Sequence, residues 1–206
     1  MGWSPRKGTR AAQKLPIDWE ELLEKSFLRK VYAIKEEDIL PQFIVNSDQT
    51  NVVYAPGDKK TWAETGAAQV ELLGGDEKRA FTVNVSVALD GSVLPFQAIY
   101  TGKTSLSCPS PLSPAYDDTK SYGFRFEPSG TNTYWSNHEM MHSYVDNILA
   151  PYFERVKAAA KRPPSQKTIW MLDVWSVQRS EAFRSWMSKN HPTIILDYVP
   201  GGGCGQ

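Results

Sequence analysis

The chain has 206 residues, of which 41% are hydrophobic and 22% are charged, and its formal net charge is zero. This composition excludes an intrinsically disordered chain, and the length suffices for one domain with a buried core. No apolar run approaches the roughly 18 residues of a membrane span, and the first residues lack the apolar stretch of a signal peptide. The two cysteines, Cys108 and Cys204, cannot build a disulfide framework. We therefore expect an intracellular protein that does not associate with a membrane.

A helix and a buried strand are predicted for the first fifty residues. Residues 18–34 carry an apolar stripe with helical spacing, and Asp18 with Glu21 resembles a capping box. Pro41 then ends the helical pattern, and residues 43–50 are typical of a short buried strand. The expected apolar stripe consists of Trp19, Leu22, Leu23, Phe27, Val31 and Ile34.

The clearest strand signal lies at residues 81–89, where apolar side chains occupy every odd position. This alternation predicts one buried apolar face and one mostly polar face. Asp90-Gly91 is a favoured two-residue hairpin turn, and residues 93–100 are expected to return as the partner strand. Residues 69–73 are a weaker strand candidate.

A long loop and a long helix are predicted next. Residues 101–135 are rich in Ser, Pro, Gly and Tyr, have no clean period, and predict a loop without regular elements. Ser136 and Glu139 then form a capping box, and the apolar stripe of the helix that follows runs to Phe153.

The last third of the chain alternates strand, helix and strand. The predicted elements are a buried strand over 168–175, a helix over about 179–189 and a strand over 193–199. Antiparallel strands followed by this alternation predict an α/β fold with a mixed sheet and helices packed on it.

Two aspartates end two apolar runs of similar kind. Asp48 follows residues 43–45 closely, and Asp173 comes directly after residues 169–172. Open α/β sheets place their chemistry at the carboxyl ends of strands, and carboxylates from separate strands can hold Mg²⁺ for phosphodiester cleavage. Taken singly, each aspartate is also typical of a turn or a cap. The metal-site hypothesis therefore requires that the two side chains converge across neighbouring strands.

Six short segments along the chain carry a more specific signal through their order and spacing. They are Asn46-Ser47-Asp48-Gln49-Thr50, Thr61-Trp62-Ala63-Glu64-Thr65-Gly66, Glu77-Lys78-Arg79-Ala80-Phe81-Thr82, Leu94-Pro95-Phe96-Gln97-Ala98-Ile99-Tyr100, Asp173-Val174-Trp175-Ser176 and Val199-Pro200-Gly201-Gly202. Together they resemble the DDE superfamily endonuclease domain of pogo- and Tigger-like transposases, in the form found in fungal copies. The resemblance covers residues 41–206. Residues 1–40 resemble the helical linker that follows a helix-turn-helix DNA-binding part in that family.

The resemblance implies a ribonuclease H-like fold with a mixed five-stranded sheet, and three acids that hold two Mg²⁺ or Mn²⁺ ions. Asp48 matches the first acid and Asp173 the second, so both are candidate catalytic residues and metal ligands. The implied reaction is attack of water, and then of a 3′-hydroxyl, on a DNA phosphodiester bond. The implied partner is DNA and the expected location is the nucleus. Homo-oligomer formation stays open.

The chain departs from the family's pattern at two positions. The third acid of the family lies in a stretch just past the Val-Pro-Gly-Gly turn that opens a final helix, whereas this sequence ends at Gln206. We therefore expect a domain truncated before the third acid and lacking the final helix. Gln178 stands where the family often carries a histidine. Because loss of an outer partner of a metal ligand costs roughly 10–100-fold in affinity or activity, we expect an impaired nuclease.

Two other motifs compete with this interpretation. Residues 138–142 match the H-E-x-x-H pattern of zinc proteases, but Val145 and Ile148 occupy the places of the downstream glycine and histidine. Residues 46–50 have the spacing of haloacid-dehalogenase-like phosphatases, but the amide of Asn46 cannot form an aspartyl-phosphate. We interpret both as chance matches.

Two functions from different classes therefore stay open. The first is a divalent-metal-dependent DNA endonuclease and strand-transfer domain, and the second is a non-catalytic remnant that binds DNA or protein with the same fold. The zero net charge is not typical of a complete DNA-binding protein, although residues 1–14 carry four basic and no acidic side chains.

Overall fold

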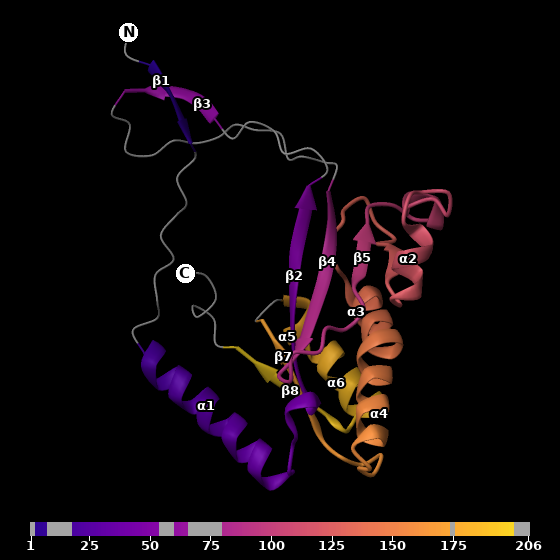
Figure 1. The fold of residues 1–206 in the computed structure, drawn as a ribbon. Coiled ribbons are helices and arrows are strands. Elements are labelled where there is room, and N and C mark those ends of the chain that lie inside the picture. Colours follow the sequence, from indigo (N-terminus) through magenta and orange to yellow (C-terminus); the bar gives the residue numbers. More distant parts are fainter. Residues whose placement is uncertain (1–2, 8–17, 54–59, 66–79, 174–175, 200–206) are drawn as a thin grey trace.

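The computed structural model describes residues 3–7, 18–53, 60–65, 80–173 and 176–199. Its centre is a six-stranded mixed sheet in the order β6-β5-β4-β2-β7-β8, flanked by helices (Figure 1). The predicted α/β class and mixed sheet are confirmed, and the candidate strand over 69–73 lies outside the described residues. The strands are β2 (Ile44–Val53), β4 (Ala80–Ala88), β5 (Gln97–Tyr100), β6 (Arg125–Pro128), β7 (Thr168–Leu172) and β8 (Ile194–Tyr198), with β1 (Trp3–Lys7) and β3 (Lys60–Glu64) in a separate antiparallel pair.

Strand β4 pairs antiparallel with both of its neighbours, and the pairs at both edges of the sheet are parallel. β2 is antiparallel to β4, and β4 is antiparallel to β5. β2 is parallel to β7 and β7 is parallel to β8, so helices must make the crossovers. The helices are α1 (Trp19–Glu36), α2 (Tyr116–Ser121), α3 (His138–Tyr144), α4 (Ala150–Ala159), α5 (Ser176–Arg179) and α6 (Glu181–Asn190).

The segment 101–135 is not the irregular loop that its composition predicts. It contains a short 3₁₀ turn over Ser105–Ser107, the helix α2 and the strand β6, which pairs in parallel with β5. β6 makes the sheet six-stranded instead of the expected five-stranded. An edge strand of four residues, stabilised by pairing with its neighbour, is too short to show a recognisable alternation of polar and apolar residues in the sequence.

Alternation along the central strands builds two cores. Val45 and Trp170 belong to the larger core, which packs against α3, α4 and α6. Their neighbours Ile44 and Ile169 belong to a smaller core on the other face, together with Phe43. Figure 1 shows α3, α4 and α6 on the side of the sheet opposite to α1. Successive side chains of β2 and β7 thus point into the two cores in turn, so that these strands are buried on both faces, as expected for central parallel strands.

The long helix predicted after the loop is interrupted. Residues Val145–Leu149 form a π-helical turn between α3 and α4. Pro151 follows at the start of α4, and because proline lacks an N–H it cannot make the regular bond to the carbonyl four residues earlier. The helix also begins one residue later than the predicted capping box, since the side chain of Asn137 caps it by accepting from Met140 N.

The apolar stripe predicted for α1 is largely exposed. Phe27 is 62% and Leu23 40% exposed, and Asp18 makes no side-chain capping bond. The end of the helix packs against the smaller core through Ala33 and Ile34. Polar contacts also attach the helix to the sheet, because Arg29 and Lys30 form ion pairs with the buried Asp197 of β8. None of the helices in the described parts of the chain is both long and apolar enough to span a bilayer.

Strand β4 faces the opposite way from its prediction. The polar residues Thr82, Asn84 and Ser86 are 3%, 1% and 0% exposed, whereas the apolar Val87 is 40% exposed. Two of these side chains find polar partners, since Thr82 Oγ1 donates to the Tyr134 carbonyl at 2.8 Å and Ser86 bonds Tyr144. Among the described residues, Asn84 Nδ2 has no hydrogen-bond partner. Satisfied hydrogen bonds remove most of the cost of burying hydroxyl groups, so packing against α3 overrides the apolar pattern.

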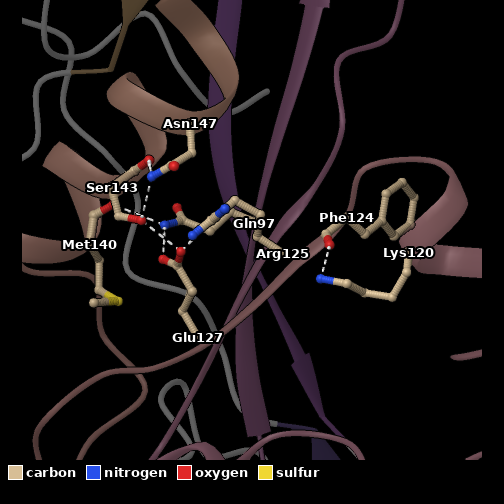
Figure 2. A network of polar contacts seen from close by, with 8 residues as sticks. All are labelled: Gln97, Lys120, Phe124, Arg125, Glu127, Met140, Ser143 and Asn147. Atoms are coloured by element: carbon tan, nitrogen blue, oxygen red, sulfur yellow. Dashed lines mark hydrogen bonds and ion pairs between the residues drawn. The ribbon is translucent and has the colours of Figure 1, made fainter. Parts of the chain in front are cut away.

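A buried polar cluster, the Glu127 cluster, attaches α3 to the edge strands (Figure 2). The carboxylate of Glu127 accepts from Gln97 Nε2 at 2.7 Å, Arg125 Nε at 2.8 Å and Ser143 Oγ at 2.6 Å. Gln97 Nε2 also donates to the Met140 carbonyl at 2.9 Å. Because these groups come from β5, β6 and α3, the cluster determines where α3 lies on the sheet.

Candidate functional site

The two aspartates singled out in the sequence lie next to each other in the fold. β2 and β7 pair in parallel with Ser47 opposite Leu172, and the same offset carried one residue further places Asp48 opposite Asp173. Neighbouring strands lie roughly 4.8 Å apart, so the two backbones bring their carboxylates to one edge of the sheet. Both side chains are exposed.

Asp48 and Asp173 line the same pocket, which has a volume of about 310 Å³. Asp48 is not at the end of its strand as the sequence predicted, because β2 continues to Val53. Its Oδ1 accepts a hydrogen bond from Gln49 N at 2.8 Å, which fixes one carboxylate oxygen. The structure thus brings together the two residues that the sequence predicted as a pair. The pocket is lined by Ser47, Asp48, Gln49, Thr50, Asn51, Thr82, Trp135, Asp173 and Gln178.

A chain of buried hydroxyl groups lies directly beneath the acidic edge. Ser47 Oγ lies 2.5 Å from Ser86 Oγ, which bonds Tyr144 OH, and Trp170 Nε1 donates to Ser47 Oγ at 2.7 Å. Burial raises the pKa of Tyr144 to about 12, partly offset by its bonds to the two serines, so its hydroxyl keeps its proton at neutral pH. These hydrogen bonds connect β2, β4, β7 and α3, and they do so at Ser47, the residue directly before Asp48.

Sequence reasoning did not identify these hydroxyl groups. Ser47 and Ser86 were placed among polar positions of strands, where a serine is ordinarily taken to face solvent. For Ser47, the signal in the sequence was its position two residues after the buried Val45, because residues two apart on a strand face the same side of the sheet.

Among the charged and amide side chains that line the pocket, that of Gln178 is the most buried, at 5% exposure. It lies on the short helix α5, and its backbone carbonyl accepts from Tyr198 OH of β8 at 2.5 Å. Among the residues that the structure describes, its buried side-chain Oε1 has no hydrogen-bond partner. The position that departs from the family's pattern therefore lies at the pocket itself.

Trp135 adds an aromatic surface to the pocket. It is 54% exposed, and its ring packs against that of Tyr134 at 5.3 Å between centroids. The bond from Thr82 Oγ1 to the Tyr134 carbonyl fixes this segment to β4. The sequence placed Trp135 in an irregular loop, and only its aromatic character next to a helix start could have singled it out.

The H-E-x-x-H motif has a packing role for one of its histidines. His138 is exposed at the first position of α3, whereas the His142 ring stacks on Trp186 at 3.9 Å and on Phe183 at 6.0 Å. Burial lowers the pKa of His142, the nearby His138 lowers it further, and Asp146 acts in the opposite direction. The ring therefore belongs to the contact between α3 and α6.

The oxygen donors at the pocket fit a hard divalent cation. Two carboxylates on adjacent strands and an unpaired amide oxygen are the ligand types that Mg²⁺ and Mn²⁺ prefer. Within the described ranges, no group of three His, Cys, Asp or Glu side chains is placed to hold a metal ion. The described residues thus provide two acidic ligands for such a cation.

Solved Mos1 complexes are among the structures similar to this chain, and one of them shares its fold. A crystal structure of a pre-cleavage Mos1 transpososome superposes with a TM-score of 0.51 and 11% sequence identity over 95% of this chain. A crystal structure of the Mos1 mariner paired end complex with Mn gives a TM-score of 0.49 and 12% identity over 93% of this chain. The chain spans about half the length of those solved chains, 47% and 46%. No protein-family model and no curated protein matches the sequence.

The sheet and its helices therefore define an α/β domain with a ribonuclease H-like fold. A solved structure with a similar fold is that of the pre-cleavage Mos1 transpososome.

Proposed function

We propose that this chain is a transposase-derived, divalent-metal-dependent DNA endonuclease and strand-transfer domain. The observation that carries the proposal is that Asp48, within β2, and Asp173, directly after the parallel neighbour β7, line one pocket. Carboxylates converging at the carboxyl ends of parallel strands are how this kind of sheet holds metal ions for phosphodiester chemistry. The similarity to the pre-cleavage Mos1 transpososome supports a DNA substrate.

Asp48 and Asp173 would hold the divalent cations through their carboxylate oxygens. When bound, such cations activate the attacking oxygen and stabilise the leaving oxygen of an in-line displacement. The chain of buried hydroxyl groups beneath Asp48 holds β2 and β7 in register, so that both carboxylates face the same phosphodiester. A substrate base can stack on the exposed face of Trp135, since aromatic side chains bind single-stranded nucleic acid in this way.

The finer assignment follows from the sequence segments around these residues. Their order supports the pogo- and Tigger-like group of transposases, and a nuclear location goes with that group. With two acidic ligands among the described residues, metal binding is weaker than a three-carboxylate site would give, and cleavage is impaired accordingly.

Calorimetric titration with Mn²⁺ and nicking of a supercoiled plasmid test the proposal together. Asp48→Asn and Asp173→Asn keep the side-chain shape but remove the charge, and each should abolish measurable Mn²⁺ binding and any nicking. Asp117→Asn is the matched control, because Asp117 is equally exposed but lies on α2, outside the pocket. Unchanged Mn²⁺ affinity in both pocket variants would overturn the metal assignment.

The second candidate function is a non-catalytic module that binds DNA or protein with the same fold. The number of acidic ligands favours it, since two carboxylates are fewer than the three that the resemblance implies. The two functions differ in a single measurement: a non-catalytic module binds a DNA oligonucleotide with the same affinity in chelator as in Mn²⁺, and Asp48→Asn leaves that affinity unchanged.

A further inference from the structure

Gln178 is held firmly at the pocket that contains the two aspartates. Its side chain is 5% exposed and lines the same wall as Asp48 and Asp173. The bond from Tyr198 OH to its backbone carbonyl fixes α5 to β8, the strand next to β7. The backbone of Gln178 therefore has a defined position next to the pocket that the acidic pair lines.

The side-chain oxygen of Gln178 lacks a partner within the described part of the chain. Oε1 is buried and accepts no hydrogen bond. A buried carbonyl oxygen without a partner destabilises a protein, and an apolar side chain of the same size would avoid that cost. A group that enters the pocket and contacts this oxygen would remove the cost of burying it without a partner.

The chemistry of the pocket selects a cation as that group. Asp48 and Asp173 contribute carboxylate oxygens, and amide carbonyl oxygens complete the coordination of hard divalent cations in proteins. We infer that Gln178 Oε1 is a further oxygen ligand, directly or through one bound water, of the divalent cation held by Asp48 and Asp173. This inference rests on the proposed function and goes beyond it, since it assigns a neutral ligand at the position where the family often has a histidine.

An oxygen ligand at this position also has a consequence for metal choice. Imidazole nitrogen suits Zn²⁺, whereas carbonyl oxygen suits Mg²⁺ and Mn²⁺. Gln178→His should therefore shift the preference of the site from Mn²⁺ toward Zn²⁺.

Titration of the 206-residue chain with Mn²⁺, read by calorimetry, tests the assignment with Gln178→Met. Methionine has the same length but no oxygen, so the metal-free variant should melt at the same or a higher temperature. Its Kd for Mn²⁺ should rise about tenfold, the lower end of the range for groups around a metal site. A purely structural glutamine predicts the opposite pattern, a lower melting temperature with unchanged affinity.

Gln49→Met is the matched control, because Gln49 lines the same pocket while its Nε2 donates to the Met141 sulfur at 3.3 Å. Its Kd should stay within about twofold of the starting protein, far below the tenfold effect expected of a ligand group. If the unsubstituted chain binds no Mn²⁺, the proposed function fails. If it binds Mn²⁺ and Gln178→Met binds equally well, only the role of Gln178 is overturned.

Gln178→Glu keeps the test decisive if the methionine variant does not fold. Glutamate retains the oxygen at the same place and adds a charge, so a ligand at this position should bind Mn²⁺ more tightly. Weaker binding by a folded Gln178→Glu protein would contradict the assignment.

Discussion

Trp170 Nε1 donates a 2.7 Å hydrogen bond to Ser47 Oγ, and this bond joins β7, which ends one residue before Asp173, to β2, which contains Asp48. Both residues are buried, so the bond is shielded from water and determines how the two strands meet at the pocket. The separation of the two carboxylates therefore depends on buried neutral groups as well as on the acids themselves.

Tyr144→Phe tests the chain of buried hydroxyl groups. The substitution removes one hydroxyl and leaves Ser86 Oγ with a partner fewer in a fully buried place. We expect the free energy of unfolding to fall by about 1–3 kcal/mol, the cost of an unsatisfied buried polar group. Urea denaturation measures it, with Tyr122→Phe as the control because Tyr122 is 71% exposed. Equal stability of both variants would show that the hydroxyl chain contributes nothing.

His142 predicts a loss of stability in mild acid. Burial lowers its pKa in the folded protein below the ordinary value of 6.5, so the unfolded chain takes up the proton at a higher pH than the folded one. The contribution of neutral His142 is therefore complete above about pH 6.5 and is lost as the pH falls toward the folded pKa. Urea midpoints measured from about pH 7.5 to about pH 5.5 should fall less steeply in His142→Phe, which keeps the stack on Trp186. An identical slope in the two proteins would count against this prediction.

The Glu127 cluster predicts a strong response to a single truncation. Glu127→Ala removes the acceptor of Gln97, Arg125 and Ser143 at once. We expect the free energy of unfolding to fall by about 1.5–3 kcal/mol, as for hydrogen bonds to a charged group. Glu24→Ala on exposed α1 serves as the control and should change stability by no more than about 0.5 kcal/mol. A change of that small size in Glu127→Ala would mean that the cluster does not position α3.

Asp197 predicts how α1 is attached to the sheet. Its buried carboxylate pairs with Arg29 Nη2 at 2.5 Å and Lys30 Nζ at 3.3 Å, and the neighbouring apolar side chains of α1 are mostly exposed. Asp197→Asn should speed amide hydrogen exchange throughout Trp19–Glu36 while β2 and β7 keep their protection. Asp38→Asn breaks an exposed pair with Arg162 near the end of the same helix and should leave exchange in α1 unchanged. Unchanged exchange in Asp197→Asn would show that other contacts hold the helix.

The sequence singled out the two aspartates that line one pocket, but it did not predict the polar groups around them. Asp48 and Asp173 could be found because each follows an apolar run, a signal that needs no knowledge of distant contacts. The buried face of β4 could not, because Thr82 and Ser86 are buried only by virtue of acceptors and donors on segments far away in the sequence. The spacing of apolar residues along a strand does not reveal hydrogen-bond partners that lie far away in the sequence.

Elements that depend on tertiary contacts were missed for the same reason. β6 is four residues long and owes its extended form to pairing with β5. The stripe on α1 has helical spacing, so the helix was predicted correctly, but spacing does not say whether a core lies opposite it. Gln178 was recognised as a departure from a family pattern, while its burial at the pocket required the fold.

The π-helical turn at Val145–Leu149 sets the rotational phase between α3 and α4. Each residue of an α-helix turns the chain by about 100°, so one residue more or fewer in this turn would swing the whole of α3 around its own axis. Tyr144 would then point away from Ser86 although every side chain in the pocket was intact. The length of this turn, more than its composition, is what a single-residue insertion or deletion would damage.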